Sequence, residues 1–418
     1  MTASDLPAGT DFPLEGVRVL DLSRVFAGPM CGMVLADFGA EVLKIEHPAR
    51  GDDTRDWGMR IGKTETTYFN GMNRNKRSVT IDLQKPEGRD LVLDMARQAD
   101  VIIENFKTGG ADKLGLGYAD IKAIKPEIVY CSVSGYDRSG PEAKRPGYDL
   151  VIQGESGLMA LNGEGHQPPL KFGVAVVDMM TGMYAAQAVL AALFQRERTG
   201  RGRHVEMALY DCGIMVTGYY GLDALQLKAD PPRFGNAHPS IVPYGVFDAA
   251  DGPVVIAVGN NAQYGRFCRE VIERPDLADD PRYATNVERA RHRSELLPLL
   301  QAEIARRPRA QLLPLLEACG IPCGEVAGLY EALSSERSRR SGLVQNMPHP
   351  VAGTVPVLAP PYRLDGTRMP LRSAPPTLGE GTREVLQRLL QLPEAELQRL
   401  QSSGVLTLPQ DPSAPSAF

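Results

Sequence analysis

The sequence has little of what marks several classes of protein. Aromatic residues make up only 6% of its 418 residues, with a single tryptophan, and the net charge is -5 with a pI near 5.8. This balance gives no broad positive field, which argues against non-specific binding of nucleic acid or of an anionic membrane surface. No apolar run approaches the ~20 residues of a membrane span. The polar, acidic N-terminal residues also lack the order typical of a secretion signal.

Cysteine is scarce and scattered. A Cys319 and Cys323 pair alone makes a poor metal site, because no histidine or second cysteine pair stands nearby. We interpret all six cysteines as reduced thiols in apolar surroundings and expect a cytoplasmic protein without a bound metal. They are Cys31, Cys131, Cys212, Cys268, Cys319 and Cys323.

Apolar and helical segments alternate along the first part of the chain. A strand pattern at 17–22, a helix pattern at 30–39 and a second strand pattern at 41–46 together indicate a βαβ unit, hence a parallel sheet. Further strand patterns follow at 79–83, 100–105, 128–136 and 204–209. The fold class predicted is therefore α/β, with a Rossmann-like parallel sheet in a large domain. No G-x-G-x-x-G stands in the first turn, which argues against bound NAD.

A change of composition after Asp230-Pro231-Pro232 predicts a second, smaller α+β domain. It contains a strand pattern at 254–258 and helix patterns at 293–305 and 309–319. The predicted organisation is a first part of the large domain at 1–225, the small domain at 226–332, an extended Pro- and Arg-rich linker that returns to the large domain at 333–407 with a helix at 382–390, and a disordered tail at 408–418.

One acid stands out. Asp178 ends the β-branched run G-V-A-V-V-D and directly precedes a long small-residue helical pattern at 183–193. A carboxylate that is desolvated and unpaired is costly, so this one needs a structural partner or a chemical use. It could cap the following helix, since aspartate accepts hydrogen bonds from the first amides of a helix. It could equally be a nucleophile, whose ionised form a helix N-terminus would favour.

Polar residues follow several predicted strands. Arg24-Val25-Phe26, Glu104-Asn105-Phe106 and Ser134-Gly135-Tyr136 each stand at a strand's carboxyl end, where parallel sheets bind ligands. We expect these groups to gather on one edge. The basic cluster of Arg74, Lys76 and Arg77 is either a solvated loop or a phosphate contact.

An ordered set of motifs gives the chain a resemblance to the class III CoA-transferases, a family that includes formyl-CoA transferase, carnitine CoA-transferase and alpha-methylacyl-CoA racemase. The similarity covers nearly all of residues 14–405. The motifs are R-V-F-A-G-P (24–29), D-F-G-A-E-V-L-K-I-E (37–46), G-D-D-T-R (51–55), N-R-N-K-R-S (73–78), E-N-F (104–106) and G-Y-D (147–149). Within the family, segments 51–58 and 235–244 look most like those of the succinyl-CoA:glutarate (dicarboxylate) CoA-transferases.

The resemblance implies an interlaced homodimer and a set of site residues. Asp178 falls on the family's nucleophilic aspartate. CoA would lie along Arg24, Val25, Phe26, Ala27, His47, Arg74, Asn105, Phe106, Lys113 and Arg145, with His47 at a position where formyl-CoA transferase has arginine. Tyr148 would form an active-site wall. Arg55 or His238 would meet the second carboxylate of an acceptor, or else form structural ion pairs. Gly259, Asn260 and Asn261 match the position of a mobile glycine loop, or form a plain strand-to-helix turn.

The implied reaction moves CoA from an acyl-CoA donor, for which the family suggests succinyl-CoA, to a free acid such as glutarate or itaconate. It would pass through mixed-anhydride and aspartyl-CoA thioester intermediates, with CoA present only as part of a substrate. A racemase on the same fold is the first alternative, but it uses a histidine at the place of Tyr148, and tyrosine with a pKa near 10 is a poor base. A non-catalytic acyl-CoA-binding protein is the second.

Overall fold

The computed structural model describes residues 12–61 and 65–409 of the chain. They pack into two compact units, described separately below. Of the described residues, the first unit comprises those up to Leu158, Phe172–Gly221 and those from Glu336 onward, and the second comprises Met159–Lys171 and Leu222–Ser335. Segment 159–171 thus differs from the predicted division, which placed it in the large domain. The backbone oxygens of Gly165 and Gln167 accept hydrogen bonds from Arg233, which ties the segment to the second unit.

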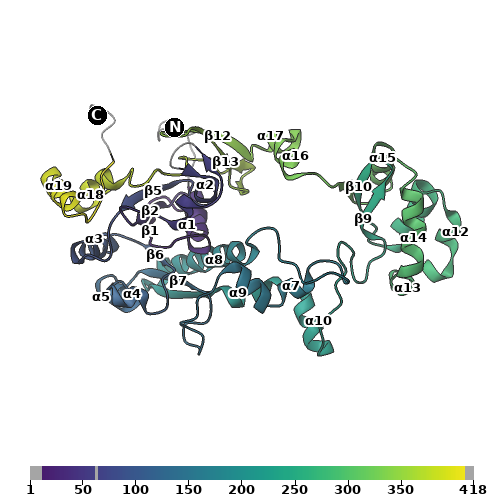
Figure 1. Ribbon diagram of the computed structural model, residues 1–418, viewed down its shortest axis with the longest axis horizontal. Coiled ribbons are helices and arrows are strands. Elements are labelled where there is room, and N and C mark those ends of the chain that lie inside the picture. The colour runs from purple at the N-terminus through teal and green to yellow at the C-terminus, as the bar shows by residue number, and fades with distance from the viewer. Residues whose placement is uncertain (1–11, 62–64, 410–418) are drawn as a thin grey trace. The chain divides into compact units, whose positions relative to one another are not determined.

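The first unit is built on a six-stranded, wholly parallel sheet (Figure 1). Val19 stands at its centre and pairs with Val42 on one side and Val101 on the other. This sheet confirms the predicted α/β class. In spatial order its strands are β5 (Lys76–Thr80), β2 (Glu41–Glu46), β1 (Arg18–Asp21), β6 (Val101–Glu104), β7 (Val129–Ser134) and β8 (Arg203–Ala208).

Helices cover both faces of this sheet, because its central strands are apolar on both sides. On one face, α1 (Ala27–Asp37) and α8 (Val176–Thr199) form a core with the strands. On the other, α3 (Pro86–Ala96), α5 (Tyr118–Ile124) and α18 (Thr382–Leu390) do the same (Figure 1). Shorter helices complete the unit: α2 (Thr67–Met72), α4 (Gly110–Lys113), α6 (Asp149–Glu155), α9 (Leu209–Val216) and α19 (Glu394–Ser402).

Helix α8 is the longest helix among the described residues, and Gly200 ends it in a left-handed conformation with φ 66°. By length and composition it could cross a membrane, but a helix of a folded core passes the same test. It packs against α1, and Gly182 is what allows the close approach. A side chain there would begin only 2.7 Å from the carbonyl oxygen of Ala27. The start of α1 is therefore pressed against α8 one turn beyond Asp178.

The second unit holds a three-stranded antiparallel sheet with helices around a separate apolar core. Its strands are β9 (Tyr244–Ala249), β10 (Gly252–Ala257) and β11 (Cys323–Glu325). The predicted strand and two helices of a small α+β domain appear here as β10, α14 and α15. Its helices include α11 (Asn261–Arg266), α12 (Pro275–Asp279), α13 (Asn286–Arg291), α14 (Arg293–Ile304), α15 (Arg309–Ala318) and α16 (Leu329–Ser334). Two more helices, α7 (Leu158–Leu161) and α10 (Tyr219–Leu227), have residues in both units.

The returning segment is more regular than its extended prediction. After α17 (Glu336–Ser341) it forms an antiparallel ribbon of β12 (Val344–His349) and β13 (Gly353–Leu358). Pro348 is tolerated in β12 because a two-stranded ribbon leaves half of its backbone amides unpaired. Near its end, Leu408 is buried and bonded to Gln401, so the order extends beyond the predicted start of the tail. The rest of that predicted tail, residues 410–418, lies outside the described residues.

Candidate active site

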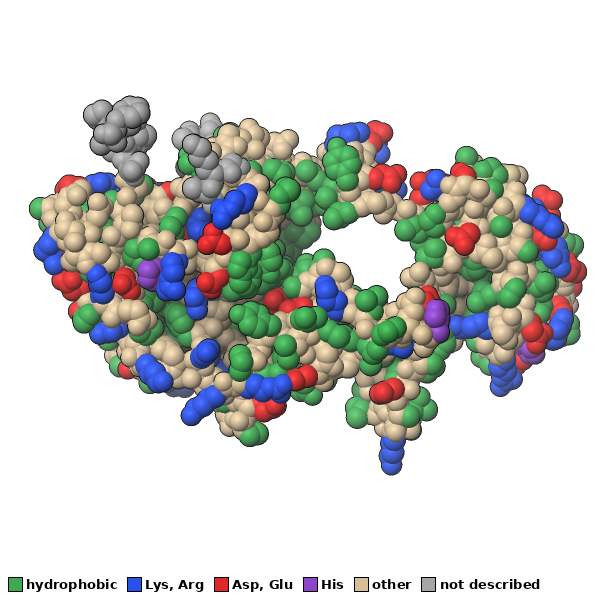
Figure 2. Space-filling model, viewed as in Figure 1, with side chains coloured by type: hydrophobic (Ala, Val, Ile, Leu, Met, Phe, Trp, Pro, Cys, Tyr) green, Lys and Arg blue, Asp and Glu red, His purple; other side chains and the backbone are tan. Residues whose placement is uncertain are grey.

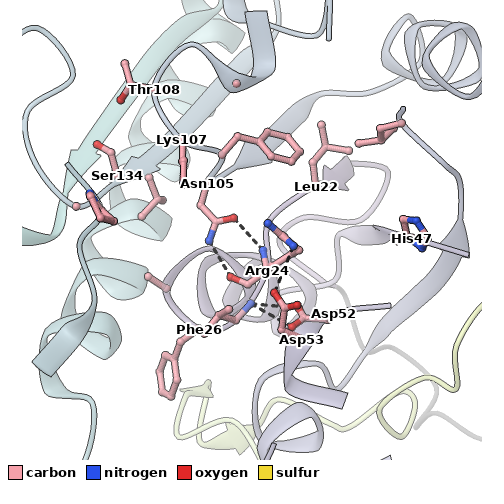
Figure 3. Close-up of a pocket in the computed structure, with 18 of the residues that line it drawn as sticks. Leu22, Arg24, Phe26, His47, Asp52, Asp53, Asn105, Lys107, Thr108 and Ser134 are labelled. Atoms are coloured by element: carbon pink, nitrogen blue, oxygen red, sulfur yellow. Dashed lines mark hydrogen bonds and ion pairs between the residues drawn. The ribbon is translucent and has the colours of Figure 1, made fainter. Parts of the chain in front are cut away.

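The first unit contains a cavity of about 650 Å³ at the carboxyl ends of β1, β6 and β7 (Figure 3). This is the sheet edge at which the sequence predicted a ligand. Eleven residues predicted from the sequence line it: Arg24, Val25, Phe26, Ala27, His47, Asn105, Phe106, Lys113, Arg145, Tyr148 and Asp178. Arg24 and Asp178, which are 154 positions apart in the sequence, therefore meet at one place, which spacing in the sequence alone could not show.

Asp178 is the third residue of α8, so it does not cap that helix. The cap comes from Asp149, the first residue of α6. Its Oδ1 accepts hydrogen bonds from the backbone amides of Val177 (2.9 Å) and Asp178 (3.2 Å), and Gln153 donates to its Oδ2 (2.6 Å). Capping, the structural alternative for Asp178, is therefore excluded. Asp149 belongs to the G-Y-D motif at 147–149, but nothing in the sequence predicted this role for it.

The carboxyl group of Asp178 is hard to ionise. Burial, and secondarily the negative charge of Asp149, raise its pKa to about 7. The sequence had suggested that the helix N-terminus would favour the ionised form, and these two opposing effects outweigh that preference. A carboxyl group whose pKa lies near neutrality inside a cavity is a strong candidate for chemistry.

An aromatic group stands near this acid. Tyr68, on α2, has its pKa raised by burial and by the negative charges of Asp178 and Asp149. Its ring meets that of Phe26 edge-to-face at 6.0 Å and that of Trp57 at 5.7 Å. Tyr68 could not be predicted as a site residue, because nothing in the segment T-T-Y-F-N (66–70) distinguishes it. The one usable signal was the lone tryptophan nearby in the chain.

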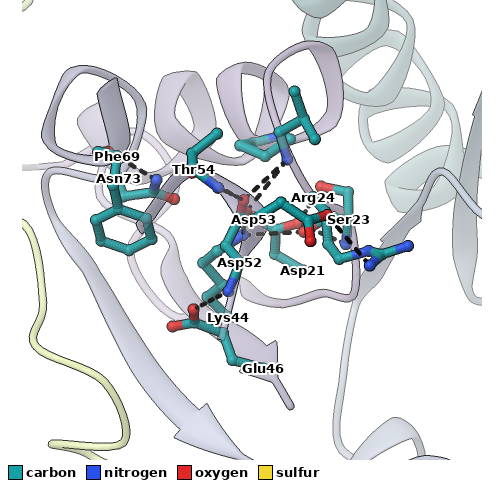
Figure 4. A network of polar contacts seen from close by, with 12 residues as sticks. Asp21, Ser23, Arg24, Lys44, Glu46, Asp52, Asp53, Thr54, Phe69 and Asn73 are labelled. Carbon is teal, nitrogen blue, oxygen red and sulfur yellow. Dashed lines mark hydrogen bonds and ion pairs between the residues drawn. The ribbon is translucent and has the colours of Figure 1, made fainter. Parts of the chain in front are cut away.

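Two buried ion pairs lie close to the loop at residues 23–27, and Figure 4 shows one of them, Lys44 with Asp52. Lys44 Nζ is 2.8 Å from Asp52, Lys76 Nζ is 2.8 Å from Asp21, and all four side chains are fully buried. Neither prediction for the basic cluster therefore describes Lys76, which is neither solvated nor available to a phosphate. Arg77 pairs with Glu384 on α18.

Two predicted arginines do not line the cavity. Arg74 is buried, with its guanidinium group bonded to Asp37 (Nε to Oδ1, 3.0 Å; Nη2 to Oδ2, 2.5 Å). Arg55 is also buried. It makes two hydrogen bonds to Glu46, of 2.8 and 2.7 Å, and lies 3.6 Å from the centre of the Phe69 ring. Both guanidinium groups are thus occupied, and Arg55 matches its alternative as a structural ion pair.

The remaining predicted residues lie in the second unit. His238 Nδ1 accepts from the amides of Ser240 and Ile241. Asn260 caps α11 by accepting from the amide of Gln263, and Asn261 accepts from Arg289. The carbonyl oxygen of Gly259 accepts from Asn286. Gly259, Asn260 and Asn261 thus form a plain strand-to-helix turn, which was the alternative to a mobile glycine loop. None of them is among the residues that line the cavity.

Several positive side chains line the cavity. Arg50, Lys107, Lys113 and Lys144 all reach it, and within the part of the chain that the structure describes none has a side-chain ion-pair partner. Only Lys113 had been predicted. By contrast, Arg145 forms ion pairs with Glu142 and Glu155, so its positive charge is largely neutralised within the protein. The missed cations resemble ordinary surface lysines and arginines in sequence, and only the fold assembles them.

The cavity therefore joins a carboxyl group of raised pKa to several cations without an ion-pair partner among the described residues, and Tyr68 lies close to that carboxyl group. Such a site suits acyl transfer on an extended anionic ligand. Within residues 12–61 and 65–409, no group of three or more His, Cys, Asp or Glu side chains is arranged to hold a metal ion.

Comparisons with known proteins bear on this chemistry. The chain is 41% identical over 394 residues to the succinyl-CoA:glutarate CoA-transferase of Mus musculus, covering 94% of this chain and 90% of that protein. It is 39% identical over 383 residues to the succinate–glutarate CoA-transferase of Agrobacterium fabrum, covering 90% and 96%. A crystal structure of a CAIB/BAIF family protein from Brucella suis superposes with a TM-score of 0.80 at 39% identity, covering 91% and 100%.

A model of CoA-transferase family III matches residues 14–382, which contain every residue of the cavity wall. The match spans both units and agrees with the high identity of the full-length relatives. The chain belongs to CoA-transferase family III and is a CoA-transferase.

Proposed function

We propose that this CoA-transferase moves CoA from succinyl-CoA to a dicarboxylic acid such as glutarate, with Asp178 as the nucleophile. The observation that carries the proposal is the position of Asp178, in the cavity that also holds the unpaired cations. The substrate class is supported by the names of the relatives from Mus musculus and Agrobacterium fabrum. A cytoplasmic location stays a prediction from the sequence.

The proposed reaction has two mirrored halves. A carboxylate oxygen of Asp178 attacks the thioester carbonyl carbon, the new C–O bond forms and the C–S bond breaks, so that the electron pair leaves on the sulfur of CoA. The thiolate then attacks the Asp178 carbonyl carbon of the mixed anhydride. That step releases the donor acid and leaves an aspartyl-CoA thioester. Because each step exchanges one activated acyl group for another, no ATP is consumed.

In the second half, the acceptor carboxylate attacks the aspartyl thioester and expels the CoA thiolate. The thiolate attacks the acceptor's carbonyl carbon in the second anhydride, which yields the new acyl-CoA and returns Asp178 as a carboxylate. Negative charge develops on a carbonyl oxygen in each addition and needs nearby hydrogen-bond donors. Phe26 and Ala27, at the start of α1, stand on the wall that faces this chemistry, and helix N-terminal amides are suited to that task.

The unpaired cations should bind the phosphates of CoA. We expect the double variant Lys107→Ala/Lys144→Ala to raise KM for the acyl-CoA about 30-fold, because each of the two lost charge-assisted contacts weakens binding by roughly 1 kcal/mol. The kcat should stay within about twofold of wild type, since neither side chain touches the reacting atoms. Initial rates over a range of succinyl-CoA concentrations give both constants. Arg201→Ala, an exposed arginine outside the cavity, is the matched control. A fall in kcat without a change in KM would contradict this placement.

The acceptor class is tested directly with purified protein, succinyl-CoA and a panel of free acids. The panel pairs each dicarboxylic acid with a monocarboxylic acid of equal chain length, and mass spectrometry identifies the product thioesters. We expect glutarate and similar dicarboxylic acids to accept CoA. Products formed only from monocarboxylic acids would sink the proposed substrate class while leaving the family membership intact.

A homodimer is part of the proposal. Helix α10 has no buried residue in the single chain, and Leu222, Leu225 and Leu227 on it are all exposed. Figure 2 shows hydrophobic side chains (green) on the surface over α10. Exposed apolar helices of this kind are usually covered by a partner, here a second copy. Sedimentation velocity at micromolar concentration should give twice the mass of the chain, and a monomer would contradict the dimer.

A further inference from the structure

Val25 has an unusual backbone. Its φ of 73° lies in the left-handed region, which β-branched residues avoid because their branched Cβ crowds the backbone. Among the described non-glycine residues with positive φ, Val25 is the one with a β-branched side chain. Such a conformation persists only where the surroundings enforce it, and it is found preferentially at functional sites. Val25 lines the cavity and directly precedes Phe26.

The restraint on this backbone comes from side chains distant in sequence (Figure 3). Both carboxylate oxygens of Asp52 lie 3.2 Å from the amide nitrogen of Val25. Asn105 holds the preceding residue from both sides, because its Oδ1 accepts from the Arg24 amide at 2.9 Å and its Nδ2 donates to the Arg24 carbonyl at 2.7 Å. The turn is thus imposed by side-chain contacts.

Asp52 is itself firmly fixed (Figure 4). It is buried, accepts from the amide (3.0 Å) and hydroxyl (2.8 Å) of Thr54, and pairs with Lys44 at 2.8 Å. Lys44 also donates to the carbonyl oxygen of Ser23 at 2.9 Å. The Lys44–Asp52 pair is therefore hydrogen-bonded to the loop at both Ser23 and Val25. The positive charge of Lys44 and the hydrogen bonds hold the pKa of Asp52 well below its ordinary value, so the carboxylate stays ionised.

The restrained turn sets where the start of α1 lies relative to Asp178. Two residues after Val25, Ala27 packs against α8 at Gly182, where a Cβ would come within 2.7 Å of the Ala27 carbonyl oxygen. Gly28 is equally tight, since a Cβ there would meet the Ser23 side chain at 2.4 Å. Both contacts are too close to allow the start of α1 to move toward its neighbours. A change of φ at Val25 would therefore move Phe26 and Ala27 against the helix that carries the nucleophile.

We propose that Asp52 is a positioning residue for CoA transfer: through the amide of Val25 it holds Phe26 and Ala27 at the distance from Asp178 that the reacting thioester requires. The inference rests on the proposed function of Asp178. Asp52 does not touch the substrate's reacting atoms in this account. Its effect is on the geometry of the wall, and misplacement of catalytic geometry by about 1 Å can cost on the order of 100-fold in rate.

The test separates this role from the structural role of pairing with Lys44. Asp52→Ala, which removes the acceptor of the Val25 amide, should lower kcat about 100-fold with KM for the acyl-CoA changed less than about threefold. Adding Val25→Gly should recover kcat at least about tenfold, because glycine adopts the left-handed turn without the restraint. Adding Lys44→Met instead should recover thermal stability, since it removes the unpaired buried charge, but not kcat. If Val25→Gly recovers nothing, or if Lys44→Met restores the rate, the proposal is overturned.

A second readout does not depend on the reaction. Hydrogen-exchange mass spectrometry should show faster exchange of the peptide covering residues 23–30 in Asp52→Ala than in wild type, and unchanged exchange there would overturn the proposal. A wild-type protein that transfers CoA while its Asp178→Asn variant is equally active would instead refute the proposed nucleophile. The exchange result distinguishes the two failures, because it reports on the loop alone.

Discussion

Asp178→Asn is expected to abolish CoA transfer, with kcat lowered at least about 10⁴-fold. The amide has nearly the shape of the carboxyl group but is a far weaker nucleophile, so neither anhydride nor aspartyl thioester can form. The measurement is the rate of product thioester formation at saturating succinyl-CoA and acceptor. Asp94→Asn, an exposed acid on α3, is the matched control and should keep wild-type rates. An Asp178→Asn rate within tenfold of wild type would refute the nucleophile.

The same substitution should stabilise the protein at alkaline pH. Because the folded pKa of Asp178, about 7, lies above its ordinary value of 3.8, the folded state binds more protons than the unfolded chain between these pH values. The stability of the wild type therefore falls as pH rises through that window. Since Asp178 is partly exposed and solvent screens it, we expect Asp178→Asn to raise the free energy of unfolding by ~2 kcal/mol at pH 8, about half of the full linkage value. Urea denaturation at pH 8 and pH 5 should show the gain shrinking at the lower pH.

Two substitutions of Asp149 should distinguish the effect of its negative charge on Asp178 from its role as the cap of α8. Asp149→Asn keeps an oxygen that can accept from the amides of Val177 and Asp178 but removes the negative charge. The pKa of Asp178 should therefore fall, and the acid limb of the pH profile of kcat/KM should move to lower pH by roughly one unit. Asp149→Ala removes the cap as well. We expect it to lower the free energy of unfolding by about 1–2 kcal/mol and kcat by on the order of 100-fold, because the first turn of α8 carries Asp178.

Asp211→Asn provides the control for these variants, since Asp211 is an exposed acid in the first turn of α9 that does not line the cavity. Its pH profile should match that of the wild type. If Asp149→Asn instead leaves the acid limb unchanged, the limb does not report the ionisation of Asp178 beside Asp149. A shift to higher pH would contradict the sign of the charge effect.

The order and type of the main elements could be predicted because they follow from local patterns. The apolar runs at β1, β2, β6 and β7 are short and bounded by turns, and helix α18 begins and ends where its pattern predicted. The ribbon β12–β13 could not be predicted in the same way, because prolines at positions 348, 350 and 356 hide the alternation of a strand.

The site was harder to predict than the fold, because its details depend on pairs far apart in sequence. Arg74 was predicted to bind a phosphate, but in the fold it pairs with Asp37. Arg55 was predicted to bind the second carboxylate of an acceptor, but it pairs with Glu46. Asp149 is 29 residues from the acid that it influences, and Tyr68 is 110 residues away. Family motifs indicate which residues gather at the site, whereas only the fold shows which charges are already neutralised within the protein.

Chemical trapping during turnover tests the covalent role of Asp178 most directly. Hydroxylamine added to working enzyme should convert an aspartyl thioester or anhydride to a hydroxamate, and borohydride should reduce the thioester to an alcohol. Peptide mass mapping should then find the modification on Asp178, only when succinyl-CoA is present. An unmodified Asp178 in enzyme that continues to form product thioester and is inactivated by neither reagent would contradict the account.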